Sequence, residues 1–195
     1  MPKRTDRSRA LILQAADAAF REFGFAESTM EDIANRAGLT RKTVYNLFAS
    51  KEDIALQLIA LVEANDAPYR NRMDAGEDAL ALLEDVFLDS AQWCLANAAL
   101  ARLALAPAER PTLEPPADRP SFQRLIRDIL LLGQKQGRIR MDDDANFMAL
   151  VLLGIYGQAM LTVLAGRPFN HAEIKHTVRI VIEGIGRRPA PSASA

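Results

Sequence analysis

Helical periodicity of the apolar residues constrains the fold of this 195-residue chain more than any other feature. Apolar side chains recur three and four positions apart along nearly the whole length, and no segment alternates convincingly between apolar and polar residues. This spacing places side chains on one face of an α-helix, whereas a strand needs a period of two. Since 49% of the residues are hydrophobic, such faces suffice for a real core. The sequence therefore predicts an all-α protein.

Glycine, proline and capping residues divide the chain into the expected elements. The predicted helices span about 6–23, 29–37 and 41–48, then a helix that follows Ser50, and after a polar break at 68–76 the longer helices 77–105, 121–137, 144–165 and 171–185. Residues 107–120 hold five of the ten prolines and predict a mobile loop. We therefore expect two domains, over 6–66 and 74–186, and a disordered tail over 187–195.

The segment from Gly38 to Phe48 predicts a tight turn followed by one short amphipathic helix. Around this helix Val44, Leu47 and Phe48 fall on one side. The other side carries polar side chains, namely Lys42, Thr43, Tyr45 and Asn46. A short helix with an apolar back and an exposed face of donors suits insertion into the major groove of DNA. Together with the short helix before it, this segment predicts a helix-turn-helix.

Positive charge is concentrated at the N-terminal end, although the whole chain has a net charge of −1. Residues 1–51 carry nine Lys/Arg and six Asp/Glu, whereas the rest carry fifteen and nineteen. Four of the first ten residues are basic, namely Lys3, Arg4, Arg7 and Arg9. Local contact with phosphate explains this asymmetry, and a solvated, disordered start explains it equally well.

The run from Thr29 to Glu52 reads Thr-Met-Glu-Asp-Ile-Ala-x-x-Ala-Gly-Leu-Thr-x-x-Thr-Val-Tyr-x-x-Phe-x-Ser-Lys-Glu, and it follows a helix that ends in Phe-Gly-Phe. This first third of the chain closely resembles the N-terminal domain of TetR/AcrR-family transcriptional regulators, whereas the remainder is similar only in its helix pattern. The resemblance implies an N-terminal three-helix helix-turn-helix domain that binds DNA and a larger C-terminal helical bundle for ligand binding and dimerisation. It also implies a homodimeric bacterial regulator, most often a repressor, that releases its operator when a small molecule binds.

The resemblance also assigns roles to individual residues. Thr29 matches a threonine that contacts phosphate, Tyr45 an aromatic residue that contacts phosphate or sugar, and Lys51 a lysine that contacts the backbone. Asn46 replaces the more usual histidine or aromatic residue, which leaves its partner base open, although asparagine can pair with adenine. Plain N-capping is an equally good interpretation of Thr29. The predicted DNA-binding residues are Thr29, Thr40, Arg41, Lys42, Thr43, Tyr45, Asn46 and Lys51.

Binding sites in helical bundles lie between helices and are mostly apolar with few polar groups. We therefore expect a small apolar or amphipathic effector, in a site lined by Leu83, Phe87, Ser90, Trp93, Cys94, Asn97, Phe122, Met148, Leu152, Tyr156 and Gln158. For each of these residues ordinary core packing is the stronger alternative. A second functional hypothesis is a DNA-binding module that is controlled by a partner protein or by no ligand, and a filled C-terminal core would favour it.

The last two helices predict a dimer interface. Glycines in the long apolar helix would allow close approach of a partner helix, and the final helix offers a stripe of β-branched residues. Two helices from each subunit would pack as a four-helix bundle. The predicted dimerisation residues are Gly154, Gly157, Leu161, Ile174, Val178, Val181, Ile182 and Ile185. The alternative is that both helices only close the core of one subunit.

Motifs of enzymes and metal sites are missing from the sequence. It contains no His-Glu-x-x-His, no cysteine cluster and no glycine-rich phosphate loop. His171 and His176 are five positions apart and do not share a helical face. The run 142–144 of three aspartates is explained more simply by helix capping than by cation binding. We therefore predict no enzymatic activity, no metal and no cofactor.

Cellular location and partners follow from the remaining features. Cys94 is the single cysteine, so no intrachain disulfide forms, as expected in the reducing cytoplasm of a bacterium. The stretch 147–165 is about long enough to span a bilayer, but Gly154, Gln158 and Thr162 interrupt it, and a buried core helix is the prediction. The expected partners are a double-stranded DNA operator, a second copy of the chain and a small effector, with no membrane.

Overall fold

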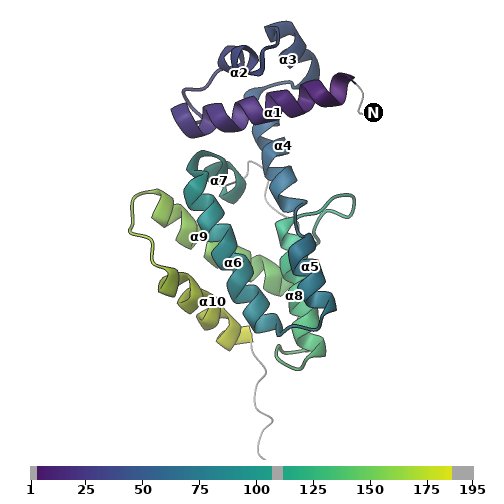
Figure 1. Cartoon of the computed structure of the whole chain (residues 1–195). Helices are drawn as coiled ribbons and strands as arrows, with labels where there is room; N and C mark the ends of the chain where they lie inside the picture. The colour runs from purple at the N-terminus through teal and green to yellow at the C-terminus, as the bar shows by residue number, and fades with distance from the viewer. Residues whose placement is uncertain (1–3, 107–111, 186–195) are drawn as a thin grey trace, which may run out of the picture. The chain divides into compact units, whose positions relative to one another are not determined.

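The computed structural model describes residues 4–106 and 112–185 (Figure 1). In these two ranges every element of regular secondary structure longer than one residue is a helix, which confirms the all-α prediction. Lys3, the start of the proline-rich loop and the predicted tail 187–195 lie outside the described residues. The described chain forms two compact units, the first within 1–62 and 94–107, the second within 63–93 and 108–195.

The first unit contains four consecutive helices and one later helix. These are α1 (Arg4–Phe23), α2 (Met30–Ala37), α3 (Arg41–Leu47), α4 (Lys51–Glu63) and α7 (Ala98–Leu105). The helix α1 packs against α2 and α7, and α2 packs against α3. Apolar side chains from several of these helices, among them Ile12, Ile33, Val44, Phe48 and Ile54, are at most 1% exposed and form the core. The unit is therefore a small helical domain built around α1.

Helical spacing over 6–23 predicts one inward face, made of Ile12, Ala16, Ala19, Phe20 and Phe23, and the structure buries all of these side chains except the last. Ile12, Ala16 and Ala19 are fully buried, and Phe20 is 3% exposed. Phe23 is 47% exposed instead, and the Arg36 guanidinium carbon lies 5.6 Å from its ring centroid. The ring meets this cation at the surface because α1 ends at Phe23 and Gly24 turns the chain with a φ of 83°.

The second unit contains α5 (Ala67–Asp74), most of α6 (Ala79–Ala96), α8 (Phe122–Lys135), α9 (Ala145–Leu164) and α10 (His171–Ile185). The helix α9 packs against α8 on one side and α10 on another. The core side chains come mainly from α6, α8 and α9, and Leu83, Phe87, Ile126, Ile129 and Leu130 among them are fully buried.

Two predicted elements differ from those observed. The polar break at 68–76 contains the helix α5, with a proline in its first turn where the missing N–H costs no hydrogen bond. The single helix predicted over 77–105 is two helices, because Asn97 leaves the helical conformation with a φ of −132° and a ψ of 48°. Its C-terminal piece, α7, belongs to the first unit. The predicted domain boundaries, 6–66 and 74–186, remain predictions.

The described part of the proline-rich loop, residues 112–120, is tied to the start of α8. The Gln123 side-chain amide donates to the carbonyl oxygens of Thr112 and Leu113 at 2.9 and 3.0 Å. Gln123 is only 9% exposed, so these bonds satisfy an otherwise buried polar group. The expectation of a mobile loop therefore does not fit residues 112 and 113.

The helix α9 is the one described helix that is long and apolar enough to cross a membrane, and a third of its apolar window is buried. Asp144 caps it by accepting a hydrogen bond from the Asn146 N–H at 2.8 Å, as predicted for the aspartate run. One face of α9 is core, with Met148, Leu152 and Tyr156 at 2–3% exposure. The opposite face is exposed, so α9 is a core helix on one face only.

Candidate nucleic-acid interface

The short helix α3 separates its apolar and polar faces as predicted. Val44 is fully buried and Phe48, just after the helix, is 1% exposed. Lys42, Tyr45 and Asn46 are exposed, Tyr45 at 46%. Arg41 is also exposed, and its guanidinium carbon lies 5.5 Å from the Tyr45 ring centroid. This face presents a cation, a phenol and an amide together, which are the groups that contact base edges and phosphates.

Threonine side chains fix where α2 and α3 begin. Thr40 caps α3, because its hydroxyl oxygen accepts from the Thr43 N–H at 3.2 Å. Thr29 caps α2 in the same way, accepting from the Asp32 N–H at 3.1 Å, while the Asp32 carboxylate accepts from the Thr29 N–H at 2.9 Å. This reciprocal pair is a capping box. The capping interpretation of Thr29 is therefore confirmed, and its phosphate contact remains a proposal.

Gly38 makes the turn between the two helices. Its φ of 65° lies in the left-handed region, which side chains with a Cβ adopt reluctantly. Its N–H donates to the Asn35 carbonyl oxygen at 3.1 Å, and the Leu39 N–H donates to the Ala34 carbonyl oxygen at 3.0 Å. The bonds tie the turn to the end of α2 and hold α3 at a defined angle to it.

Lys51 has partners other than those the sequence suggests. Its ammonium group donates to three main-chain carbonyl oxygens between α1 and α2, at 2.8, 2.9 and 3.1 Å. The side chain is thus held against the turn that precedes α2, at the surface of the unit, instead of extending freely into solvent. Arg9 behaves similarly, since its guanidinium donates to the Leu47 carbonyl oxygen at 3.1 Å. The sequence predicted only that this arginine is a basic N-terminal residue, because charge does not indicate direction.

The residues predicted to line a ligand site are brought together only in part. Phe87 lies 5.9 Å from Phe122 and 4.8 Å from Tyr156 between ring centroids, and the Tyr156 hydroxyl lies 2.9 Å from the Ser90 hydroxyl oxygen. Leu83, Met148 and Leu152 are buried in the same unit. These four polar and aromatic side chains, Phe87, Ser90, Phe122 and Tyr156, are called the aromatic cluster below.

Three other predicted lining residues lie elsewhere. Cys94 and Asn97 are buried but belong to the first unit. Gln158 is exposed, because it lies on the outer face of α9, two positions beyond Tyr156 on the buried face. Its assignment to a buried site is therefore wrong. Trp93 is half-buried.

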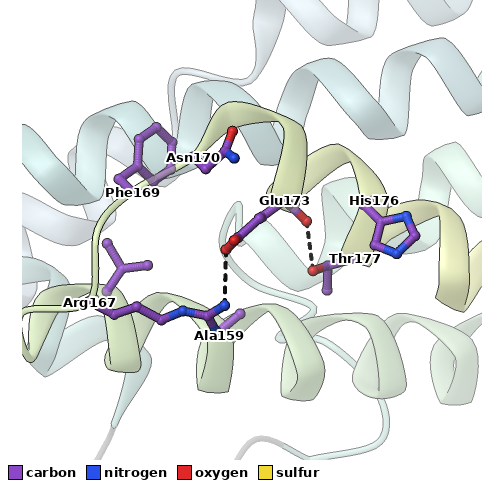
Figure 2. A pocket seen from close by; sticks show the side chains of 8 residues that line it. Ala159, Arg167, Phe169, Asn170, Glu173, His176 and Thr177 are labelled. Atoms are coloured by element: carbon purple, nitrogen blue, oxygen red, sulfur yellow. Dashed lines mark hydrogen bonds and ion pairs between the residues drawn. The ribbon is translucent and has the colours of Figure 1, made fainter.

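Two pockets of the second unit lie away from the aromatic cluster. One, of about 260 Å³, lies between the end of α9 and the start of α10 (Figure 2). Arg167 and Glu173 form an ion pair across it at 3.3 Å, and the Thr177 hydroxyl donates to the Glu173 carbonyl oxygen at 2.8 Å. The other, of about 320 Å³, lies between α5 and α8 beside Arg70 and Asp128. Both pockets are lined by charged side chains, whereas the sequence predicts a mostly apolar ligand site.

The predicted dimerisation residues separate into exposed and buried groups. Gly154 is exposed with open space where a Cβ would be, and Leu161 is half-buried. Gly157 is buried, and Val181 and Ile182 are 8% and 7% exposed. These three pack inside the unit and offer a partner little surface, as the alternative interpretation expected. The side chains of Ile174, Val178 and Ile185 lie outside the described residues.

Metal-binding clusters are absent from the described residues: no group of three or more histidine, cysteine or acidic side chains comes together there. Cys94 is buried at 2% exposure, as expected of a structural thiol. In the first unit, the two capped helices α2 and α3 and the turn at Gly38 define the class of protein as one with a helix-turn-helix.

Comparison with known proteins gives the family. The family model of bacterial regulatory proteins of the tetR family matches residues 12–58. The chain is 30% identical over 146 residues to the HTH-type transcriptional repressor KstR2 of Mycobacterium tuberculosis, which covers 72% of this chain and 73% of KstR2. It is 40% identical over 60 residues to the HTH-type transcriptional regulator TtgR of Pseudomonas putida, covering 30% of this chain and 29% of TtgR.

Among solved structures, Thermus thermophilus FadR in complex with lauroyl-CoA is similar over 96% of this chain and 100% of that chain, with a TM-score of 0.75 and 25% identity. The chain belongs to the TetR family of bacterial transcriptional regulators. It is therefore a regulator of transcription and not an enzyme, as the sequence predicted.

Proposed function

We propose that this protein is a homodimeric repressor that binds a palindromic operator through α3 and releases it when an amphipathic effector binds the second unit. The exposed face of α3 carries the proposal. Lys42, Tyr45 and Asn46 project from a helix that is capped by Thr40 and anchored by the buried Val44. Arg41, Thr43 and Thr29 flank this face and would contact the DNA backbone. The protein would act in the bacterial cytoplasm.

The outer face of α9 supports a dimer. Phe147 and Ile155 on this face are 57% and 43% exposed, and Ile180 of α10 is 55% exposed. Gly154 lies between the first two, with nothing within 4 Å of the position a Cβ would take. Exposed apolar side chains around a small residue are typical of a surface that another helix covers. Gln158 and Leu161 continue this face, and we propose it as the contact between two copies.

The aromatic cluster and one relative both favour an effector with an apolar chain and a polar group. The cluster joins apolar rings to a polar handle, the hydrogen-bonded Tyr156 and Ser90 hydroxyls. Such a combination suits a molecule with an apolar chain and one polar group. The FadR relative is in complex with lauroyl-CoA, which has this character. We therefore propose an acyl chain or acyl thioester as the effector class, with entry between α6, α8 and α9.

Rings that contact one another must separate before a chain enters between them. The described form of the second unit would then be the form without effector, and the effector would select a minor form in which Phe87 and Phe122 have moved apart. A regulator without a ligand would keep these contacts permanently. The ring contacts of Phe87 with Tyr156 and Phe122, at centroid distances of 4.8 and 5.9 Å, are therefore also what the second hypothesis, control by a protein partner or by no ligand, expects.

Fluorescence titration of Trp93 tests the effector. Trp93 is the single tryptophan of the chain and lies three residues after Ser90 on α6. Lauroyl-CoA, lauric acid and free coenzyme A are titrated into the protein, and each is then added to a protein–operator complex. We expect one of the two acyl compounds to change the fluorescence and release the operator, and free coenzyme A to do neither. Fluorescence changes without release, or no change with any compound, would contradict the proposed effector class.

A further inference from the structure

Lys51, the first residue of α4, ties together the turn that precedes α2. Its ammonium group donates to the carbonyl oxygens of Phe25, Ala26 and Ser28 at 2.8, 2.9 and 3.1 Å. It also lies 4.7 Å from the centroid of the Phe25 ring. An ammonium group has three donors, so these carbonyls occupy all of them. The ammonium group of Lys51 therefore has a full set of main-chain partners in the free protein.

Arg9, on α1, makes the corresponding contact at the end of α3. One of its terminal nitrogens donates to the carbonyl oxygen of Leu47, the last residue of α3, at 3.1 Å. The other donates to the Gln57 side-chain oxygen at 3.0 Å, and the guanidinium carbon lies 4.6 Å from the Phe48 ring centroid. The last carbonyls of a helix lack partners within it, so a cation there supplies a missing donor.

These two cations hold the two ends of the same segment. The carbonyls bound by Lys51 lie just before α2, and the carbonyl bound by Arg9 ends α3. We propose that Lys51 and Arg9 are positioning residues, which set the orientation of α3 by binding main-chain carbonyls at both ends of the helix-turn-helix, and that neither side chain contacts DNA phosphate. This inference rests on the DNA binding by α3 proposed above.

The alternative of a phosphate contact has an identifiable cost. For Lys51 to reach a phosphate, its ammonium would have to leave three carbonyl oxygens, and hydrogen bonds to charged donors are stronger than neutral ones. The turn before α2 would then lose all three bonds at once. Lys42 differs, because it is exposed on α3 and can reach DNA without such a loss. The two lysines therefore give a matched pair for an experiment.

The experiment compares Lys51→Met and Arg9→Met with Lys42→Met. Methionine keeps most of the apolar stem and removes the charge and the donors. Lys51→Arg and Arg9→Lys are the conservative variants. For each protein we would measure the midpoint temperature of thermal unfolding. At a temperature well below the lowest midpoint, we would then measure two affinities over a range of salt concentrations. One is for the operator sequence that the wild-type protein selects from random duplex DNA, and the other is for an unrelated duplex.

We expect both methionine substitutions at Lys51 and Arg9 to weaken operator binding about tenfold or more, which is the size of one lost base contact. Binding to the unrelated duplex and the salt dependence should stay as in the wild type, since no phosphate contact is lost. The conservative variants should restore part of the operator affinity. Lys42→Met should weaken operator binding with an unchanged thermal midpoint.

Two results would overturn the inference. A phosphate contact predicts equal losses for both duplexes and a slope of log affinity against log salt that is lower by about 0.9. A role in stability alone predicts a lower thermal midpoint and unchanged operator affinity in the folded variant. A wild-type protein that prefers no sequence would instead count against the proposed function, so the two failures are distinguishable.

The wild-type protein allows a second measurement if the methionine variants do not fold. Nuclear magnetic resonance of ¹⁵N-labelled lysine side chains reports whether the Lys51 ammonium changes partners when the operator is added. We expect its signal to stay at the position found in the free protein. A new coupling between that nitrogen's protons and a DNA phosphorus would overturn the inference.

Discussion

Individual side chains of the helix-turn-helix are fixed by short-range hydrogen bonds. The Asp32 carboxylate accepts from the Thr29 hydroxyl at 2.6 Å and from the Thr29 N–H at 2.9 Å. These two bonds, of which the one from the hydroxyl has the larger effect, hold the pKa of Asp32 below its ordinary value. Because the folded state favours the charged carboxylate, the pair stabilises the protein only while Asp32 is ionised.

The pH dependence of stability follows from this shift. A carboxyl whose pKa is lowered by folding contributes fully above its unfolded pKa, about 3.9, and loses the contribution as pH falls through the folded pKa. We therefore expect the stability difference between wild type and Asp32→Asn to be largest near neutral pH and to shrink below about pH 4. Urea unfolding at a series of pH values measures it, with Glu52→Gln, in the first turn of α4, as control. A difference that grows on acidification would contradict this account.

The structural roles of some of these residues could be predicted from the sequence, and the roles of others could not, for a physical reason. Thr29 and Thr40 were predictable as caps, because capping depends on neighbours three positions away. Lys51 and Arg9 were not, since their partners lie 23 to 48 positions away in the chain and only folding brings them close. The family resemblance assigned Lys51 to the DNA backbone, and charge left Arg9 undecided between phosphate contact and solvent, whereas in the folded chain both side chains donate to main-chain carbonyl oxygens.

At the scale of elements, α5 is held in an unusual way. None of its residues is fully buried, and only Tyr69 and Met73 among its large apolar side chains are partly covered. Arg70 pairs with Asp66 and Asp128, Arg72 pairs with Glu77 and Asp85, and the Tyr69 hydroxyl donates to Asp89 at 2.5 Å. The hydrogen bond from Arg72 lowers the pKa of Glu77. Ion pairs and a hydrogen bond therefore supply much of the attachment of α5.

Salt should loosen α5 more than its neighbours. Ion pairs with a third of their surface exposed are screened as the ionic strength rises, whereas apolar packing is not weakened in this way. We expect amide hydrogen exchange over 67–74 to accelerate between 0.1 M and about 1 M sodium chloride, with little change in the buried part of α8. Arg70→Met should speed exchange at low salt and reduce the salt effect, and the ion pairs of Arg72 with Glu77 and Asp85 should preserve the rest. An amide exchange rate over 67–74 that does not change with salt concentration would contradict an electrostatic attachment.

The contact of α8 with α6 depends on a glycine. A Cβ on Gly133 would lie 2.8 and 2.9 Å from the Ile139 side chain and 3.1 Å from the Ala79 Cβ. Ile139 is 1% exposed, so it has little room to move.

We therefore expect Gly133→Ala to destabilise the protein by about 1–3 kcal/mol, the usual cost of overpacking. Urea unfolding measures the change. Gly184→Ala is the control, because nothing lies within 4 Å of that position. The control should stabilise α10 by about 0.5–1 kcal/mol through helix propensity. A Gly133→Ala protein as stable as wild type would mean that Ile139 can shift.

For the whole molecule, periodicity predicted the all-α class and the helices on either side of Gly24, Gly38, Gly137 and Gly166. The interruption of 77–105 at Asn97 and the helix at 67–74 were missed, because asparagine is only moderately unfavourable in a helix and α5 has no apolar stripe. The face of α9 was missed for a related reason. A helix that is apolar nearly all round gives little signal of which side is core, so the sequence did not show that Gln158 is exposed and Gly157 buried.

Assembly of two copies through α9 gives a prediction at this scale. An arginine at Gly154 has space in one subunit but would bury a charge in the proposed interface. We expect Gly154→Arg to sediment as a monomer with the helix content of wild type, and to lose most of its operator affinity, because a monomer contacts one half-site. Gln92→Arg, at an exposed position of α6, is the control and should remain dimeric. A dimeric Gly154→Arg protein would place the interface elsewhere.

Selection of bound sequences from random duplex DNA by the purified full chain tests the central claim most directly. The account predicts a palindromic consensus with two half-sites, and a consensus that weakens or changes when Asn46→Ala or Lys42→Ala replaces the wild type. Half-site centres about one helical turn apart or somewhat more would fit two α3 helices in successive major grooves. Recovery of no consensus, or one that both α3 substitutions leave unchanged, would contradict recognition by α3.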